Sequence, residues 1–350
     1  MTATKITPRV VSDPLPVRPA GRPLHVPDAG WAVTRASQVG AVLGDPNYEV
    51  ASAQPGGGTG SVAWLRSSVS RFTNGAEHAR RRARTIAELD RLPPEHLRAE
   101  AEALARAVMD AAAAAGHIDL MARLARRVPT AVLAARLGFP DASRAADAVC
   151  ILAPAYFPGA SADCERAADA ATAELAGMLA PAGEEEIVTR IQLLVQGCDA
   201  TAALIGKAVC RVLPPLADAR ARAWPTDAIL AEVLRYDPPL RVSRRVSRQD
   251  ARLDGHLIAA GSAVLLHVDS ANRDPEVCAE PETFDPGRTD GSNLTFGSGL
   301  RPCPGQQQAT MLAAGVVDAV RDQGTVIIGP VEYEPQVNLR IPARLKVGLR

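Results

Sequence analysis

The longest regular pattern in the chain is an apolar run without a distinct polar face, over Ile187–Leu213. A helix that is apolar around most of its circumference belongs in the interior of a protein, so the pattern predicts a buried central helix. Apolar residues also recur at helical spacing over Ala76–Ala115, with a break at Pro93 and Pro94. The chain therefore has a helix-rich centre, which we place at residues 76–239.

Shorter elements flank this centre. Proline, glycine and capping residues delimit four further helices. One starts near Ser37, one ends near Leu179, one begins at the cap Thr226 and one follows Gly305. Residues that alternate between apolar and polar predict strands. The three strand-rich regions are expected near residues 31–36, 240–267 and 326–350, after a proline-rich extended arm at 1–30.

Composition supports a globular protein and excludes some partners. Hydrophobic residues make up 47% of the chain and charged residues 22%, which is enough for a substantial core. Lys and Arg together number 39, as do Asp and Glu, so charge gives no support for nucleic acid or an anionic membrane as a partner. The N-terminus lacks a signal-peptide pattern and we find no membrane-length apolar stretch, so we expect a soluble, cytoplasmic protein.

Six cysteines are scattered along the chain without a Cys-x-x-Cys pair, which favours reduced thiols over a zinc site or a disulfide framework. One of them, Cys303, stands apart. It lies in FGSGLRPCPG, residues Phe296–Gly305, where three glycines permit a tight loop that can press against a flat ligand. A thiolate held in this way can ligate haem iron.

This segment resembles the cysteine-ligand signature of the cytochromes P450, Phe-Gly-x-Gly-x-(His/Arg)-x-Cys-x-Gly, at every fixed position. The resemblance extends from Trp31 to the end of the chain. It implies a mainly α protein with smaller β regions (α+β), the haem-thiolate fold, as one domain over 1–350 that is shorter than usual. It also implies haem b as cofactor and Cys303 as the ligand of its iron.

Further motifs fit the same family. Glu232 and Arg235 match its Glu-x-x-Arg pair, which forms a buried ion network behind the haem loop, and they precede FDPGR at Phe284–Arg288. The resemblance implies that cationic side chains meet the haem propionates. The haem-contacting residues implied are His78, Arg82, Arg245, Phe296, Arg301, Cys303 and Gly305.

The central helix departs from the family pattern (Ala/Gly)-Gly-x-(Asp/Glu)-Thr-Thr. The chain has Gln196, Gly197, Cys198, Asp199, Ala200 and Thr201. Gly197 and Asp199 match, but Ala200 replaces the oxygen-side threonine. Thr201 cannot simply take its place, because one residue along a helix turns a side chain by about 100°. We assign this segment to catalysis, with Asp199 able to relay protons and Gln196 adding an amide.

Three residues are candidates for substrate contact: Arg241, Ser243 and Ile341. If Arg241, Ser243 and Arg245 share one strand, their side chains share one face, and an arginine there favours a substrate with a carboxylate or carbonyl groups. The alternative is that Arg241 turns outward or meets a propionate. We also expect the segment before the central helix to be abbreviated, so that the helix starts near Glu184 after a short turn.

The resemblance implies an oxidoreductase of the monooxygenase type. It would activate O2 with electrons from a ferredoxin and its ferredoxin reductase, and hydroxylate a small organic substrate, a specialised metabolite. Ala200 leaves open oxidative coupling, use of peroxide, or substrate-assisted chemistry on the same fold. A haem-binding protein without turnover is the alternative of another class.

Overall fold

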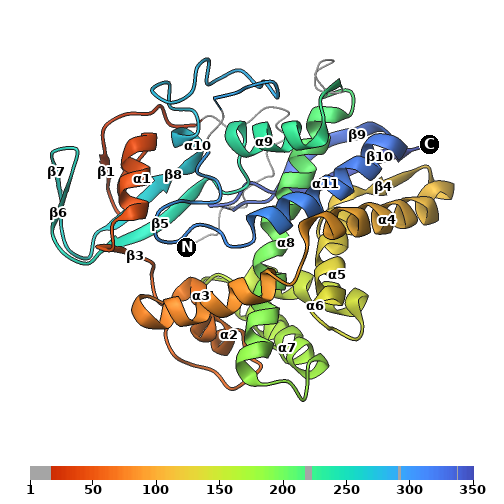
Figure 1. Ribbon diagram of the computed structural model, residues 1–350, viewed down its shortest axis with the longest axis horizontal. Helices are drawn as coiled ribbons and strands as arrows, with labels where there is room; N and C mark the ends of the chain where they lie inside the picture. Colours follow the sequence, from red (N-terminus) through yellow and green to blue (C-terminus); the bar gives the residue numbers. More distant parts are fainter. Residues whose placement is uncertain (1–16, 217–222, 291–292, 337) are drawn as a thin grey trace.

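A computed structural model describes residues 17–216, 223–290, 293–336 and 338–350. Its axis is helix α8, Glu184–Val212, which crosses the centre of the molecule (Figure 1). This is the predicted central helix. Contrary to our reading of the sequence, α8 is long and apolar enough to cross a membrane, but 67% of its most apolar window is buried inside the protein. The burial accounts for its hydropathy, because a core helix needs apolar side chains on most sides.

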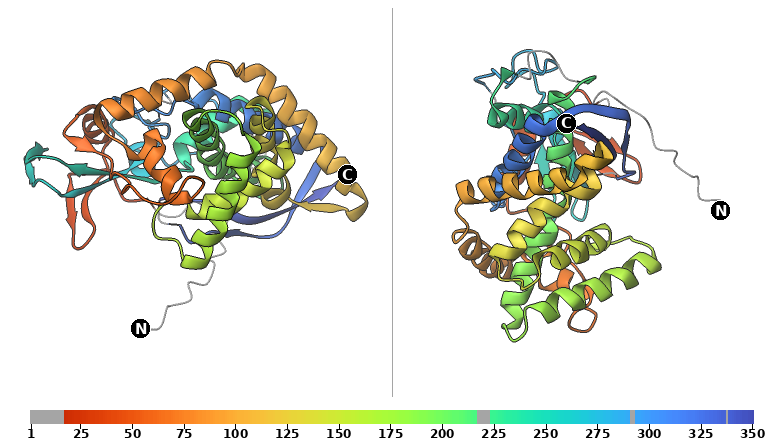
Figure 2. Two further views of the ribbon diagram at one scale, coloured as in Figure 1. Left: turned by 90° about the horizontal axis from the view of Figure 1, so that it is seen from below. Right: turned by 90° about the vertical axis from the view of Figure 1, so that its right-hand side faces the viewer.

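Helices surround α8 on the side opposite to the larger sheet (Figures 1 and 2). Both α11 and α5 pack against it, and α4 packs on α11. The α-helices longer than one turn are α1 Ala36–Gly44, α2 Val62–Ser68, α3 Gly75–Leu89, α4 Pro94–Ala112, α5 Arg127–Arg136, α6 Ala142–Leu152, α7 Ala162–Met178, α8, α9 Thr226–Tyr236 and α11 Gln306–Gln323.

The strands form two main sheets at opposite ends of the molecule (Figure 1). The larger has the order β1-β2-β8-β5-β3 and joins strands from residues 24–49 with strands from residues 242–267; β2 and β8 are parallel. Its strands are β1 Leu24–Val26, β2 Gly30–Val33, β3 Tyr48–Glu49, β5 Val242–Ser247 and β8 Ala263–His267. The smaller sheet, β4-β10-β9, contains His117–Asp119, Pro342–Leu349 and Gly324–Tyr333. The hairpin of β6 Ala251–Leu253 and β7 His256–Ile258 projects from the larger sheet.

The predicted fold class, mainly α with smaller β regions, is confirmed. The connection before α8 is also as short as predicted: α7 ends at Met178 and α8 begins at Glu184, with only turns between them. Three acidic residues occupy the first turn of α8, where negative charge stabilises a helix N-terminus.

Some local predictions were wrong or incomplete. Thr226 is the first residue of α9 and not its cap, which is Pro225. The Thr226 hydroxyl instead donates to Asp318 of α11, so a tertiary contact takes the place of a local one. Helices α2 and α6 and strand β4 were not predicted. Both α2 and β4 are short and take their stability from neighbours rather than from their own pattern.

Helices α4 and α11 approach each other closely at Gly315. A Cβ atom there would lie 2.2 Å from the carbonyl oxygen of Arg98 and 2.8 Å from the nitrogen of Glu102, both in the backbone of α4. Backbone atoms cannot move aside as a flexible side chain can. Only glycine therefore permits this helix spacing.

We predict that Gly315→Ala lowers the free energy of unfolding by about 1–3 kcal/mol, because the added methyl overpacks the α4–α11 contact. Gly40→Ala is the control, since Gly40 lies in α1 and a Cβ added there would have no heavy atom within 4 Å. That substitution should leave stability unchanged or raise it by up to about 1 kcal/mol. Denaturant unfolding measures both, and equal stabilities for the two variants would contradict the packing argument.

Candidate active site around Cys303

The loop that carries Cys303 is fixed at several points by its own backbone. The Cys303 N–H donates to the carbonyl oxygen of Phe296 at 2.7 Å, and the Leu300 N–H donates to that of Leu43, in α1, at 3.1 Å. Gly299 has φ +63°, and a Cβ there would lie 2.5 Å from the Leu43 oxygen. The signature glycine at 299 therefore serves the close approach of this loop to α1.

The Cys303 side chain is exposed, yet enough protein surrounds it that desolvation raises the pKa of its thiol. A backbone hydrogen bond from Gly305 and the charges of Arg71 and Arg82 act in the opposite direction. Pro304 has no N–H to offer, so the backbone donor to the sulfur is one residue further along. A metal ion that displaced the thiol proton would therefore bind a sulfur whose negative charge is stabilised by two arginines and one backbone N–H.

A buried ion pair lies behind this loop. Arg235 of α9 donates from Nε to Glu232 Oε2 at 2.8 Å and from Nη2 to Glu232 Oε1 at 2.6 Å; the two residues are 1% and 4% exposed. The remaining Arg235 donors reach the carbonyl oxygens of Pro281 at 3.0 Å and Thr283 at 2.9 Å. Glu232 also accepts from the Asp285 N–H at 2.8 Å. The pair thus holds the segment 281–285 against α9.

Asn272 extends this network to the cysteine loop. Its amide nitrogen donates to Thr295 Oγ1 at 2.9 Å, and its amide oxygen accepts from the Leu294 N–H at 2.7 Å. Arg235 Nη1 contacts the Asn272 carbonyl oxygen at 3.3 Å. Thr295 directly precedes Phe296, so a continuous set of hydrogen bonds connects α9 to the start of the signature segment.

Cationic side chains gather on the other side of the loop. Arg82 donates to the carbonyl oxygen of Pro302 at 2.6 Å. Arg301 donates to the carbonyl oxygen of Thr73 and to Asn74 Oδ1. His78, on the same face of α3 as Arg82, has a pKa lowered to about 4 by burial and by the charges of Arg301 and Arg82. The loop, α3 and the turn before α3 therefore present several positive groups together.

Arg245 of β5 completes this set and Arg71 enlarges it. Arg245 is 8% exposed and donates to Ser243 Oγ at 3.0 Å. Burial, followed by the charges of Arg71 and Arg301, lowers its pKa to about 10. Arg71 was not predicted, because it belongs to no motif; its guanidinium lies 5.2 Å from the ring centroid of Phe157.

We call Arg71, Arg82, Arg245 and Arg301 the arginine cluster. Within the described part of the chain, none of the four forms an ion pair with an acidic side chain at 4.0 Å or less; Glu49 acts on Arg301 only at longer range. Arg71 is exposed, but Arg82 and Arg301 are partly buried and Arg245 is buried, and buried or partly buried cations that repel one another are costly unless an anion joins them. A thiol beside an arginine cluster without acids is a donor set that fits haem b, which needs an axial thiolate and partners for two propionates.

The departure from the family pattern, Ala200 in place of a threonine, lies on a partly exposed face of α8. Leu193, Gln196, Gly197 and Ala200 are partly exposed and lie on one face of the helix; Asp199, beside this face, is also partly exposed. Thr201 is 3% exposed and lies outside this face, so it does not supply the hydroxyl that Ala200 lacks.

Asp199 also has a partner that the sequence did not predict. Arg126, at the start of α5, donates from Nε to Asp199 Oδ1 at 2.9 Å and from Nη2 to Glu334. The charges of both acids oppose the effect of burial and raise the pKa of Arg126. Asp199 is therefore held in an ion pair with Arg126.

The three substrate candidates divide. Ser243 and Arg245 share a face of β5, as the alternation predicted. Arg241 precedes β5 and its Nε donates to the buried carboxylate of Asp269 at 2.7 Å, a partner that the sequence did not predict. Ile341 is 0% exposed in the main core, so the structure gives it no surface for a substrate.

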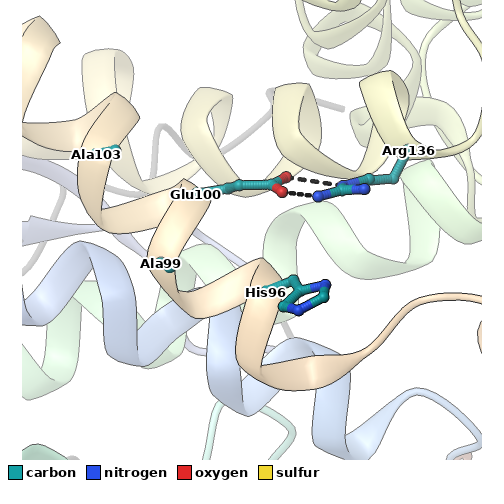
Figure 3. Close-up of a pocket in the computed structure, with 5 residues that line it drawn as sticks. All are labelled: His96, Ala99, Glu100, Ala103 and Arg136. Carbon is teal, nitrogen blue, oxygen red and sulfur yellow. Dashed lines mark hydrogen bonds and ion pairs between the residues drawn. The ribbon is translucent and has the colours of Figure 1, made fainter.

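A shallow pocket of about 390 Å³ lies elsewhere, between α4 and α5. His96, Ala99, Glu100, Ala103 and Arg136 line it, and Glu100 and Arg136 form an ion pair across it (Figure 3). None of these residues belongs to the candidate site, so this pocket lies apart from the chemistry of Cys303.

Comparison with known proteins agrees with the geometry. The family model described as Cytochrome P450 matches residues 212–314, which contain Glu232, Arg235 and Cys303. The vitamin D3 dihydroxylase of Streptomyces griseolus is 29% identical over 324 residues, 84% of this chain and 80% of its own. The cytochrome P450 monooxygenase PikC of Streptomyces venezuelae is 29% identical over 343 residues, 85% and 78% of the two chains.

Solved structures share the fold. P450BioI, in complex with an acyl carrier protein, has a TM-score of 0.78 at 22% identity and 92% coverage of each chain. CalO2 has a TM-score of 0.78 at 23% identity, over 94% of this chain and 92% of its own. The chain belongs to the cytochrome P450 family. It is an oxidoreductase of the monooxygenase type.

We predict that Glu232→Gln lowers the free energy of unfolding by about 3–5 kcal/mol, because it leaves a buried arginine charge without its partner. The matched control is Asp163→Asn, which breaks the i,i+3 pair with Arg166 on exposed side chains and should cost less than about 1 kcal/mol. Urea unfolding compares the two, and a cost for Glu232→Gln no larger than the control would show that the buried pair does not stabilise the fold.

A second prediction concerns pH and the haem-free protein. His78 has a folded pKa of about 4 against an ordinary value of 6.5, so the unfolded chain binds more protons at this site in that interval. Its contribution to stability is therefore present above pH 6.5 and lost as the pH falls towards 4. His78→Gln should flatten the decline of stability over this interval; an unchanged slope would mean that His78 does not titrate as described.

Proposed function

We propose that the chain binds haem b through the Cys303 thiolate and uses O2 with two electrons from a ferredoxin to hydroxylate a small organic substrate. The balance is one oxygen atom into the product and one into water, with two electrons and two protons consumed. The observation that carries the proposal is the exposed Cys303 beside an arginine cluster that has no acidic partner among the described residues.

Each group of residues has a task in this proposal. When bound, the haem would supply the redox chemistry that activates O2, and an electron-rich thiolate ligand would favour that chemistry. Cys303 would hold the iron, with the Gly305 N–H donating to its sulfur. The arginine cluster and His78 would hold the two carboxylates, and Glu232 and Arg235 would keep the loop in place from behind.

Proton supply is the step at which the chain differs from its family. Asp199 would exchange protons near the oxygen side of the site, with Arg126 controlling its position. Because Ala200 lacks a hydroxyl and Thr201 is buried away from this face, substrate-assisted or peroxide-using chemistry is the second candidate. A hydroxyl on the substrate would then supply the missing donor.

Partners follow from the same proposal. Relatives named as a dihydroxylase and a monooxygenase support hydroxylation of a small molecule, and we extend this to a specialised metabolite. A separate ferredoxin and ferredoxin reductase would deliver electrons in the cytoplasm. Product formation with such a reductase system separates these enzymes from a haem-binding protein without turnover.

We predict that the purified protein, reduced and exposed to CO, shows the red-shifted absorption band that gives the family its name. Cys303→Ala should lose this band entirely, because it removes the thiolate that binds the iron. Cys164→Ala, a half-buried cysteine of α7, should keep it in full. A normal band in Cys303→Ala would contradict the assignment of Cys303 as the ligand of the iron.

A further inference from the structure

A hydrogen bond links the central helix to the loop between α6 and α7. The amide nitrogen of Gln196 donates to the hydroxyl of Tyr156 at 2.7 Å. The family pattern has a small residue where Gln196 stands, so this contact belongs to this chain. Tyr156 is 2% exposed, and burial raises the pKa of its hydroxyl to about 12, which keeps the phenol neutral at any working pH.

Arg66 of α2 fixes the loop that carries Tyr156. Arg66 of α2 is 9% exposed and donates to the carbonyl oxygens of Tyr156 at 3.2 Å, of Phe157 at 3.4 Å and of Ala155. Its charge is paired with Glu165 at 3.1 Å. Three carbonyl oxygens on one guanidinium define the path of this loop and hence the position of the phenol.

Aromatic packing adds to this restraint. The ring of Tyr156 lies 5.5 Å from those of Phe72 and Phe157, which are typical distances for edge-to-face and tilted pairs. The neighbouring Arg71 acts electrostatically on both the Tyr156 hydroxyl and the Cys303 thiol. Tyr156 thus lies within reach of the charges that surround the candidate site, although no motif contains it.

Gln196 occupies the face of α8 on which the missing hydroxyl would lie. It precedes Ala200 by four residues, about one helical turn, so the two side chains point in the same direction. Both are partly exposed, as is Gly197 between them. With its amide nitrogen committed to Tyr156, the amide oxygen of Gln196 is left as an acceptor, and the side chain cannot rotate freely.

We propose that Gln196, held by Tyr156, orients a water molecule beside Ala200 and so replaces the threonine hydroxyl that the family uses there. Gln196 is the residue that contacts the water and Tyr156 is a positioning residue. This proposal rests on the proposed function, because the water matters only if O2 is reduced at this face.

The proton balance is simple. The water donates one hydrogen bond to the Gln196 amide oxygen and directs its other proton towards the reacting oxygen; bulk water replaces the proton that it gives. Two electrons and two protons reduce O2 to hydrogen peroxide, whereas four of each reduce it to two molecules of water. A well-placed proton donor favours O–O cleavage and therefore the second outcome.

The test needs no knowledge of the substrate. NADPH, ferredoxin reductase and ferredoxin are supplied to the haem-loaded enzyme, and NADPH, O2 and hydrogen peroxide are measured together to give the ratio of water to peroxide formed. Tyr156→Phe keeps the ring and removes only the hydroxyl. We expect the ratio to fall about fivefold, the factor that corresponds to one neutral hydrogen bond. Gln196→Leu should lower it at least as much.

Two controls separate positioning from general damage. Tyr48→Phe removes a hydroxyl from another buried tyrosine, on β3, and should leave the ratio unchanged. Ala200→Thr, placed in the Tyr156→Phe background, should restore the ratio, because it returns the hydroxyl at the position that the family uses. A structural defect at Tyr156 would not be repaired by a threonine on α8.

The spin state of the ferric haem gives a second test that does not require turnover. A water held at this face favours the low-spin form of the ferric haem, so Tyr156→Phe and Gln196→Leu should increase the high-spin share of the absorption spectrum, and Tyr48→Phe should not. Unchanged spin state and unchanged water-to-peroxide ratio in both variants, with the thiolate CO band intact, would overturn this proposal alone. Loss of the CO band from the unmodified protein would instead overturn the proposed function.

Discussion

The buried pair of Glu232 and Arg235 is the interaction on which the site depends. Two charges inside a protein persist only when every donor and acceptor is satisfied, and here Arg235 uses its remaining N–H groups on the carbonyl oxygens of Pro281 and Thr283. These bonds hold irregular backbone that has no strand or helix of its own. Asn272 continues the network to Thr295. The ion pair of Glu232 and Arg235 therefore helps to fix the position of the cysteine loop without contacting Cys303 itself.

The opposite condition holds on the other side of the loop. The whole chain has as many acidic as basic residues, yet the arginine cluster has no acid paired with it in the described residues. Charges of one sign that gather with three of the four buried or partly buried oppose folding unless an anion joins them. One side of the site is thus complete within the protein, and we propose that a ligand with negative charge completes the other. A flat macrocycle with two carboxylates meets that requirement.

Much of this could be predicted from the sequence. The signature around Cys303, the Glu-x-x-Arg spacing and the apolar run of α8 are local patterns, and local patterns translate directly into loops, helix faces and burial. Arg71 and Tyr156 could not be predicted in this way, because they belong to no motif and meet the site only through the packing of separate loops. The surroundings of Arg241 and Ile341 could not be predicted either: alternation gives the face of a strand, but not that Asp269 pairs with Arg241 or that Ile341 lies in the main core.

The central claim is that the arginine cluster exists to bind the two carboxylates of haem while Cys303 binds its iron. Titration of the haem-free protein with haem b and with its dimethyl ester, followed by absorption, tests this most directly, since the ester keeps the ring and the iron but loses both charges. The account predicts that the ester binds at least about a hundredfold more weakly, as two charge-assisted contacts of about 1.5–3 kcal/mol each require. Equal affinity for the two compounds would contradict it.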